Sequence, residues 1–335
     1  MLKPVLCGGE ILLDFLSRDA SKGLASTTVF EKRPGGSIFN VAVGLRRLGV
    51  SAALLTKLGG DEFGQGLMNV ITDEDIGTEC LKRDSTLKTT LAFVALNREG
   101  KPEFRFYRDH AADTALTASD TEHISPQDYC AYHFGSIALL EQPASDTYLE
   151  LLVRFREARV LTSFDPNVRP SLVGDRTTFV RMFDRICSMV DIIKLSDEDL
   201  QYVTGVADVT EGLKMVRSTA DALVLVTLGK NGAMVSFKGA CWRVPTFDSV
   251  EVLDTTGCGD SFMAGTIAGL LNGGGLASLS KHRLTDIVTF ANAAATIVST
   301  RYGASNAMPR LLEVEEFLAV HRDAGEQGGR GSAAT

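Results

Sequence analysis

Residues 254–262 read Asp254-Thr255-Thr256-Gly257-Cys258-Gly259-Asp260-Ser261-Phe262, and Met263-Ala264-Gly265 follow. Gly257 and Gly259 stand immediately before an apolar run that predicts a helix from about residue 258. Glycine lets the backbone approach a ligand closely and adopt conformations that are closed to other residues. Because the first N–H groups of a helix lack internal partners and the helix dipole adds partial positive charge, the segment predicts an anion site. Such a site suits the terminal phosphate of a nucleotide.

Asp260 lies at the rim of this predicted anion site. A carboxylate beside a phosphate-binding helix end can accept a proton from an attacking hydroxyl, and phosphoryl transfer otherwise needs mainly positioning and charge neutralisation. The alternative is that Asp260 only caps the helix and that the glycines only form a tight turn. The flanking Asp254-Thr255-Thr256 and the small residues after Asp260 favour the catalytic hypothesis, in which Asp260 is the base.

Short apolar runs alternate with helical patterns from about residue 131 onward. The expected strands cover residues 131–134, 160–164, 191–195 and 222–227, and two long helices follow at about 258–271 and 284–300. Strands separated by helices predict a mainly parallel sheet that is covered by helices on both faces, which is an α/β fold.

The first third of the chain adds apolar strand candidates, a helical pattern that stops at Gly49, and a predicted hairpin at 89–96 and 103–107. The aromatic residues of this hairpin suit a flap better than a core strand. We therefore expect one α/β domain over residues 1–325, with a lid formed by about 10–33 and 88–109. The small, polar residues 326–335 predict an unstructured tail.

Composition limits the possible partners and compartment. Of 335 residues 44% are hydrophobic, which suffices for a large core, and the net charge of −8 argues against sequence-independent binding to nucleic acid or anionic membrane. The cysteines show neither C-x-x-C nor metal-ligand spacing, as is typical of reduced cytosolic thiols. The sequence has no signal-peptide pattern at its start and no apolar run that could span a membrane. We expect a soluble, cytoplasmic protein.

Residues 254–265 closely resemble the C-terminal motif of the ribokinase (PfkB) family of sugar kinases, whose usual form has alanine in place of Cys258. A thiolate at a helix start would be a nucleophile, but a small residue tolerated in the loop is the favoured reading of Cys258. A second motif stands at the family's N-terminal spacing and comprises Gly35, Gly36, Asn40, Ala42, Gly49 and Gly59, followed by residues 60–64. The resemblance covers residues 5–310 and implies a ribokinase-like fold with a small β-strand lid.

Within the family, residues 9–15, 91–94, 106–108, 134–136 and 165–169 look most like those of fructokinases. The resemblance implies an ATP-dependent kinase that converts D-fructose to D-fructose 6-phosphate. Two alternatives remain open. One is the same chemistry on 2-keto-3-deoxygluconate or on a riboside, and the other is a non-catalytic binding protein on the kinase fold.

The resemblance also implies roles for individual residues. Sugar hydroxyls would be held by Asp14, Gly35, Gly36 and Asn40, with Phe93, Phe106 and Arg108 on the lid above the sugar. A carboxylate accepts hydroxyl protons and an amide both donates and accepts, so the chemistry is reasonable. The plainer readings are an edge-strand charge for Asp14, a partnered polar residue on an apolar helix for Asn40, and packing for the lid aromatics.

The nucleotide and its phosphates would lie on the other side of the site. The implied phosphate-facing residues are Asn167 and Arg169, the latter stabilising the transferring group together with Gly257, Cys258 and Gly259. The implied nucleotide-side residues are Lys194, Thr227, Gly229, Gly232 and Asn292. Residues 227–232 form a strand-end turn, where open α/β sheets bind ligands.

One family element departs from its usual form, because N-x-x-E reads Ser196-Asp197-Glu198-Asp199 here. Asp199 is accordingly the expected but altered Mg²⁺ contact. The family often binds a monovalent cation, and the implied K⁺ ligands are Asp254, Thr256 and carbonyl groups near Gly303. Exposed lid-strand edges favour a homodimer.

Overall fold

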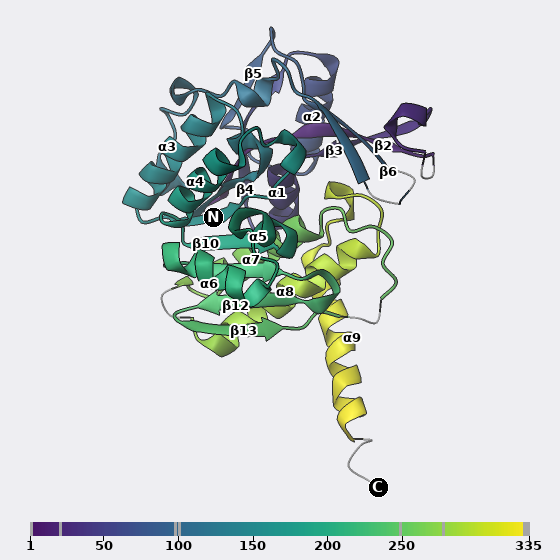
Figure 1. Ribbon diagram of the computed structural model, residues 1–335, viewed down its shortest axis with the longest axis vertical. Coiled ribbons are helices and arrows are strands. Elements are labelled where there is room, and N and C mark those ends of the chain that lie inside the picture. The colour runs from purple at the N-terminus through teal and green to yellow at the C-terminus, as the bar shows by residue number, and fades with distance from the viewer. Residues whose placement is uncertain are drawn as a thin grey trace.

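The structure, a computed structural model, describes residues 3–19, 22–96, 99, 102–247, 250–276 and 279–330. Within these residues, nine strands form one sheet in the order β13-β12-β11-β10-β9-β8-β1-β4-β5 (Figure 1). Their bounds, in chain order, are β1 Val5–Gly8, β4 Ala52–Gly59, β5 Leu81–Asp84, β8 Ala131–Gly135, β9 Leu161–Asp165, β10 Ile192–Ser196, β11 Leu223–Thr227, β12 Ala233–Phe237 and β13 Ala240–Val244.

Strands β5 to β11 of this sheet pair in parallel, whereas β12 and β13 add an antiparallel hairpin at one edge. Successive side chains point to opposite faces: in β1, Val5 and Cys7 enter one hydrophobic cluster and Leu6 enters the other. Both faces are therefore buried, as parallel sheets require.

Helices cover each face of the main sheet. One face packs against α1 (Ser37–Arg47), α2 (Glu62–Asp73), α7 (Cys258–Asn272) and α8 (Lys281–Ser299). The other packs against α3 (Ala144–Glu157), α4 (Arg176–Cys187), α5 (Asp197–Thr204) and α6 (Val209–Thr219). The predicted α/β fold with helices on both faces is confirmed.

A second sheet stands beside the first and joins β3 (Phe30–Gly35), β2 (Leu12–Ser17), β6 (Leu91–Leu96) and β7 (Pro102–Tyr107) in that order (Figure 1). We call this four-stranded sheet the lid sheet. It draws on the two predicted lid segments, and β6 and β7 pair antiparallel as the predicted hairpin. The division of the chain into one domain with a lid stays a prediction.

Small residues set how closely α7 packs between its neighbours. A Cβ on Gly44 of α1 would come 2.7 Å from Cβ of Ala264, and one on Gly265 would come 3.0 Å from Cα of Ala291 in α8. The small residues after Asp260 therefore let α1 and α8 approach α7 at close range, which brings the start of α7 against α1.

Helix α9 (Leu311–Arg330) extends away from the rest of the molecule (Figure 1). It continues into the segment 326–335 for which an unstructured tail is predicted, and residues 331–335 lie outside the described part of the chain. Among the described helices, none combines the length and apolar composition that a membrane span requires.

Candidate active site

The predicted site residues lie partly at the carboxyl edge of the main sheet and partly on the lid sheet beside it. Strand β1 lies between β8 and β4, so the loops that leave the ends of β1 and β8 diverge there. Such a switch in strand order is the usual ligand-binding place of an open α/β sheet. The loop after β9 carries Asn167 and Arg169, and the turn after β11 carries Gly229 and Gly232, on the same edge of the sheet.

Asp260 is the third residue of α7 and is only 7% exposed. Its Oδ1 accepts a hydrogen bond from Ser37 Oγ at 2.7 Å, and its Oδ2 accepts one from Asn40 Nδ2 at 2.8 Å. The N-cap of α7 is Gly257, without a side-chain cap, so Asp260 does not have the capping role considered above. A carboxylate has about four acceptor positions, so two remain for a substrate hydroxyl.

The loop before Asp260 needs glycine at position 257, and Gly259 leaves room for a lysine side chain. Gly257 has φ +81°, and a Cβ there would lie 2.9 Å from Cα of Ala304. A Cβ on Gly259 would lie 2.8 Å from Nζ of Lys194. Helix geometry leaves the N–H groups of Gly259 and Asp260 without helical acceptors, so a cationic side chain and free amides meet at one place.

The thiol of Cys258, at the start of α7, is neutral, whereas Lys194 of β10 beside it is positively charged. Burial, with a smaller effect of Asp254 and Asp260, raises the pKa of the Cys258 thiol to about 12, so the residue stays a neutral thiol and not a nucleophile. Lys194 Nζ lies 2.8 Å from Asp165 Oδ2. Burial lowers the pKa of Lys194, but the nearby carboxylates, Asp165 first, more than offset this and hold it above its usual value.

Asp14 belongs to the same site. Burial raises its pKa to about 7, while Arg169 lowers the pKa of Asp14 and Asp260 raises it further, so both of these charged groups act on the Asp14 carboxyl group. Gly35, in the neighbouring strand, lies in contact with the Asp14 carboxylate, and a side chain on Gly35 would displace it. The structure thus brings together Asp14, Gly35 and the predicted base.

Two side chains that the sequence analysis did not select complete this group. Ser37 contributes the hydroxyl that binds Asp260, and Glu10 Oε1 accepts a hydrogen bond from the Ser37 main-chain N–H at 3.0 Å. Both side chains are buried, at 7% and 1% exposure. Their only sequence signals are their positions, since Ser37 follows the Gly35-Gly36 pair and Glu10 follows the Gly-Gly turn after β1.

The lid prediction needs correction at Phe93. In the lid sheet Asp14 pairs with Ala92, whereas Phe93 pairs with Phe15. Phe93 stacks on Phe15 with ring centroids 4.8 Å apart, on the face of the lid sheet opposite to Asp14. Phe106 pairs with Ala92 and so shares the face of Asp14, as expected.

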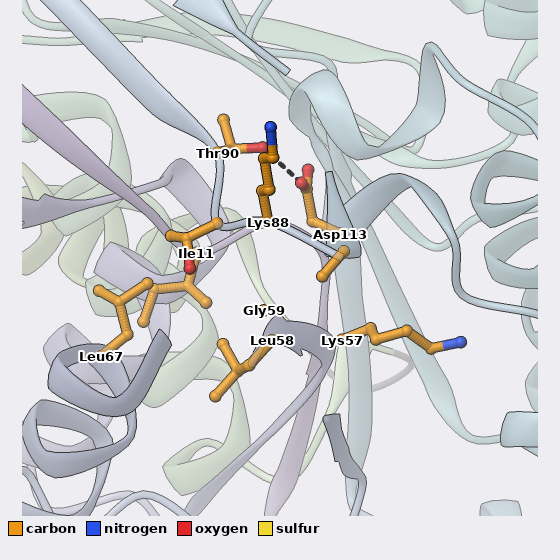
Figure 2. Close-up of a pocket in the computed structure, with 10 residues that line it drawn as sticks. Ile11, Lys57, Leu58, Gly59, Leu67, Lys88, Thr90 and Asp113 are labelled. Atoms are coloured by element: carbon orange, nitrogen blue, oxygen red, sulfur yellow. Dashed lines mark hydrogen bonds between the residues drawn. The ribbon is translucent and has the colours of Figure 1, made fainter. Parts of the chain in front are cut away.

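Arg108 also differs from its expected place above the sugar. Its Nε and Nη2 donate to Asp113 Oδ2 at 2.9 and 2.7 Å, and its Nη1 donates to the Ile137 carbonyl oxygen at 3.0 Å. Asp113 also accepts a hydrogen bond from Thr90 Oγ1 at 2.5 Å, next to a pocket that contains none of the predicted site residues (Figure 2). Arg108 therefore anchors the base of the lid sheet and does not cover the sugar.

Asn167 and Arg169 lie in the loop after β9. Arg169 Nη1 donates to Asn167 Oδ1 at 2.7 Å, and the guanidinium lies 5.8 Å from the ring centroid of Phe104 in β7. Arg169 thus reaches from the main sheet to the lid sheet. Asp199, expected near Mg²⁺, accepts backbone N–H groups of Val168 at 2.8 Å and Ser196 at 2.9 Å. Each oxygen of Asp199 therefore accepts one backbone N–H group, and the bond to Val168 orders the loop that carries Arg169.

The remaining nucleotide-side residues lie farther along the same edge. Gly229 and Gly232 both have positive φ in the turn after β11, and Thr227 Oγ1 donates to the Leu195 carbonyl oxygen at 3.4 Å. Asn292 is buried in α8, and its Nδ2 donates to the Pro245 carbonyl oxygen at 2.9 Å. The Asn292 amide thus ties α8 to the chain that follows β13.

The three residues expected around a monovalent cation do meet. Asp254 Oδ1 accepts from Thr256 N and Oγ1 at 2.9 and 2.6 Å, and Asp254 Oδ2 accepts from Gly303 N at 2.9 Å. No group of three or more His, Cys, Asp or Glu side chains suited to a metal ion occurs within the described residues.

Comparisons with known proteins identify relatives over nearly the whole chain. The model of the pfkB family carbohydrate kinases matches residues 3–311. Fructokinase-1 of Zea mays is 35% identical over 316 residues, which covers 94% of this chain and 97% of the maize protein. The probable fructokinase-6 of Arabidopsis thaliana, a chloroplastic protein, is 36% identical over 94% of this chain and 82% of its own length.

Solved structures are similar over the whole fold. Fructokinase with bound ATP from Xylella fastidiosa superposes with a TM-score of 0.85 at 30% identity, covering 96% of this chain and 100% of that one. Fructokinase from Vibrio cholerae O395, with fructose, ADP and a calcium ion bound, has a TM-score of 0.82 at 28% identity over 95% and 99% of the two chains. A double mutant of the Vibrio protein holds fructose, ADP and a potassium ion.

Proposed function

The chain belongs to the pfkB family of carbohydrate kinases, and from this premise we propose that it transfers the γ-phosphoryl group of ATP to D-fructose, giving D-fructose 6-phosphate and ADP. It is thus a phosphotransferase with an alcohol group as acceptor. The observation that carries the proposal is the buried Asp260 carboxylate, which Ser37 and Asn40 orient beside the amide-lined anion site. The fructose and ADP bound to the Vibrio cholerae relative support the choice of substrates.

In the proposed mechanism, fructose lies between the lid sheet and the start of α1, with Asp14 and Asn40 binding its hydroxyl groups. Asp260 accepts the proton of the reacting hydroxyl while the sugar oxygen forms a bond to the γ-phosphorus. The bond from that phosphorus to the bridging oxygen breaks, and ADP leaves with this oxygen.

Charge that develops on the transferring group would be met by the amides of Gly259 and Asp260 and by the Lys194 ammonium group. Arg169 would add positive charge from the lid side of the cleft. Mg²⁺, which usually retains several waters, would neutralise the ATP phosphates and be held mainly by phosphate oxygens and water. Asp199 would order the loop of Arg169 through the two backbone amides that its oxygens accept, and its two remaining acceptor positions would be open to Mg²⁺ or to a water of that ion.

The substrate proposal is tested by coupled ADP release with purified protein across a panel of acceptors. The panel contains D-fructose, D-glucose, 2-keto-3-deoxygluconate and a riboside, and phosphorus NMR identifies the phosphorylated position. We expect release with fructose and phosphate on O6. Release with another acceptor but not with fructose would reject fructose as the substrate, and no release with any acceptor would reject the kinase activity.

A monovalent cation would bind where Asp254, Thr256 and Gly303 meet, beside the anion loop. The potassium ion in the Vibrio cholerae relative supports this proposal. Replacing K⁺ by tetramethylammonium at constant ionic strength should lower kcat, because the large cation cannot enter such a site. Equal rates in the two salts would dismiss the potassium requirement.

We further infer a homodimer that forms through the lid sheet. Its outer strands β3 and β7 have free edges within the described residues. Large apolar side chains on and near them are exposed, among them Val29 at 55% and Tyr107 at 62%. Exposed strand edges with apolar neighbours favour pairing with another chain.

A further inference from the structure

Helix α1 begins without a cap of its own. Its N-cap residue is Gly36, which has φ 108° and no side chain that could accept a hydrogen bond from a backbone N–H group. A Cβ on Gly36 would lie 2.6 Å from the Glu10 carbonyl oxygen, so a capping serine or aspartate cannot replace this glycine. The first turn of α1 also contains no acidic residue.

Glu10 supplies the missing cap from outside the helix. Its Oε1 accepts the N–H of Ser37, the first residue of α1, at 3.0 Å. A carboxylate is favourable there because the N-terminus of a helix carries unpaired N–H groups and partial positive charge. Glu10 lies 27 positions before Ser37, directly after β1, and therefore fixes the helix start to the main sheet.

This placement is costly for stability. Glu10 is 1% exposed, and its Oε2 has no hydrogen-bond partner within the described residues. A buried carboxyl group with an unpaired oxygen normally destabilises a fold. The groups that face it from other elements are Arg108, at the base of the lid sheet, and the Ser136 hydroxyl after β8. Stability alone therefore does not explain Glu10.

The site geometry does explain it, because Ser37 joins two carboxyl groups. Its main-chain N–H binds Glu10, and its hydroxyl binds Asp260 Oδ1 at 2.7 Å. Asn40, one turn later in α1, binds Asp260 Oδ2. A shift or rotation of the first turn of α1 would therefore turn the plane of the Asp260 carboxylate.

We propose that Glu10 and Ser37 are positioning residues for the base: Glu10 holds the first turn of α1, and the Ser37 hydroxyl holds Asp260 in the orientation that receives the sugar proton. This inference rests on the proposed kinase function. Neither residue needs to touch the sugar or the nucleotide for it to hold.

The first test removes only the hydroxyl. Ser37→Ala keeps the N–H that binds Glu10 but removes one donor to Asp260, and it should lower kcat about tenfold or more, with the KM for ATP little changed. The acidic limb of kcat against pH should also move to higher pH, because a donor that favours the ionised base is lost. Ser37→Thr retains a hydroxyl group, so the acidic limb of its kcat against pH should lie at the same pH as in the wild-type protein.

The second test asks whether Glu10 acts through Ser37. Glu10→Gln retains an oxygen acceptor for the Ser37 N–H and should change kcat by a few-fold at most, whereas Glu10→Ala removes the cap and should lower kcat about as much as Ser37→Ala. In the double variant Glu10→Ala/Ser37→Ala the two losses should not multiply, because both act on one interaction. Asp208→Ala, which removes the cap of α6, is the matched control and should leave kcat unchanged.

The outcomes separate this inference from the function. A wild-type pH profile in Ser37→Ala, or losses that multiply in the double variant, would overturn the positioning role while the kinase activity stands. If Glu10→Ala does not fold, the pH dependence of kcat in Ser37→Ala still tests the positioning role. Wild-type protein that phosphorylates no sugar would instead reject the proposed function.

Discussion

At the scale of single residues, the site depends on a few hydrogen bonds between distant parts of the chain. Ser37 and Asn40 lie 223 and 220 positions before the carboxylate that they orient. Asp260 in turn lies in the first turn of a helix whose free amides suit a phosphate. The proposed base and the proposed anion site are thus neighbours in sequence, whereas the groups that hydrogen-bond to Asp260 are far away in sequence.

The base assignment predicts a specific kinetic loss for Asp260→Asn. An amide keeps the shape of the side chain but cannot accept the hydroxyl proton, so kcat should fall by about a hundredfold or more. ATP binding, measured by calorimetry, should remain near the wild-type value because the backbone amides are intact. Turnover within a few-fold of wild type would reject Asp260 as the base.

Glu10 predicts a pH-dependent change in stability. Burial raises its pKa from 4.5 to about 7, so the folded protein binds this proton more tightly than the unfolded chain. The cost of ionising Glu10 therefore starts above about pH 4.5 and is complete above about pH 7. Glu10→Gln should be about as stable as wild type at pH 4.5 and more stable at pH 8, by at most about 3 kcal/mol.

Urea unfolding of both proteins at the two pH values, without substrate, measures this difference. If the free energies of unfolding of wild type and Glu10→Gln differ by the same amount at both pH values, the pKa of Glu10 does not change on folding.

At the scale of elements, the lid sheet and the main sheet are joined by a buried ion pair. Arg108, directly after β7, binds Asp113 and the Ile137 carbonyl oxygen, with side-chain exposures of 8% and 3% for the two charged partners. Thr90 Oγ1, directly before β6, binds the other oxygen of Asp113 (Figure 2). Both strands of the lid hairpin are thereby fixed at their bases.

Arg108→Met should therefore act mainly on stability. It leaves the Asp113 carboxylate buried without its cation, which typically costs about 3–5 kcal/mol. Thermal unfolding should show a clear fall in Tm. Arg105→Met, in β7 just before Arg108 but exposed, is the matched control and should change Tm little. If Arg108→Met instead has a normal Tm and a raised KM for fructose, Arg108 binds the sugar as the sequence predicted.

At the scale of the whole molecule, the lid sheet has one face on the site and another that carries an aromatic cluster. We call Phe15, Phe30, Phe93 and Tyr107 the lid cluster. Its rings lie 4.8 to 5.5 Å from Phe93, and Tyr107 is 62% exposed. A second copy of the chain would cover this surface.

The homodimer proposal predicts two subunits per particle in analytical ultracentrifugation at micromolar concentration. Tyr107→Glu places a charge in the lid cluster and should shift the protein to monomers. Met215→Glu is the control, because Met215 is exposed at 47% on α6, away from the lid sheet. A monomer in the wild-type protein would refute the dimer.

Much of the site was predictable because local backbone geometry is encoded by neighbouring residues. Gly257 adopts φ +81° and Gly36 adopts φ 108°, and each precedes a helix that the apolar pattern predicts. Glycines, helix starts and strand ends are short-range features. The α/β fold, the anion loop and the base candidate therefore follow from the order of residues along the chain.

Only the tertiary structure decided which side chains face one another. Phe93 and Phe106 look equivalent in sequence, but strand pairing places them on opposite faces of the lid sheet. Arg108 finds Asp113, and Ser37 connects Glu10 to Asp260. A strand's face inverts with a one-residue change of register, and a side chain's partner depends on elements far away in sequence. Those relations arise only when the whole chain packs.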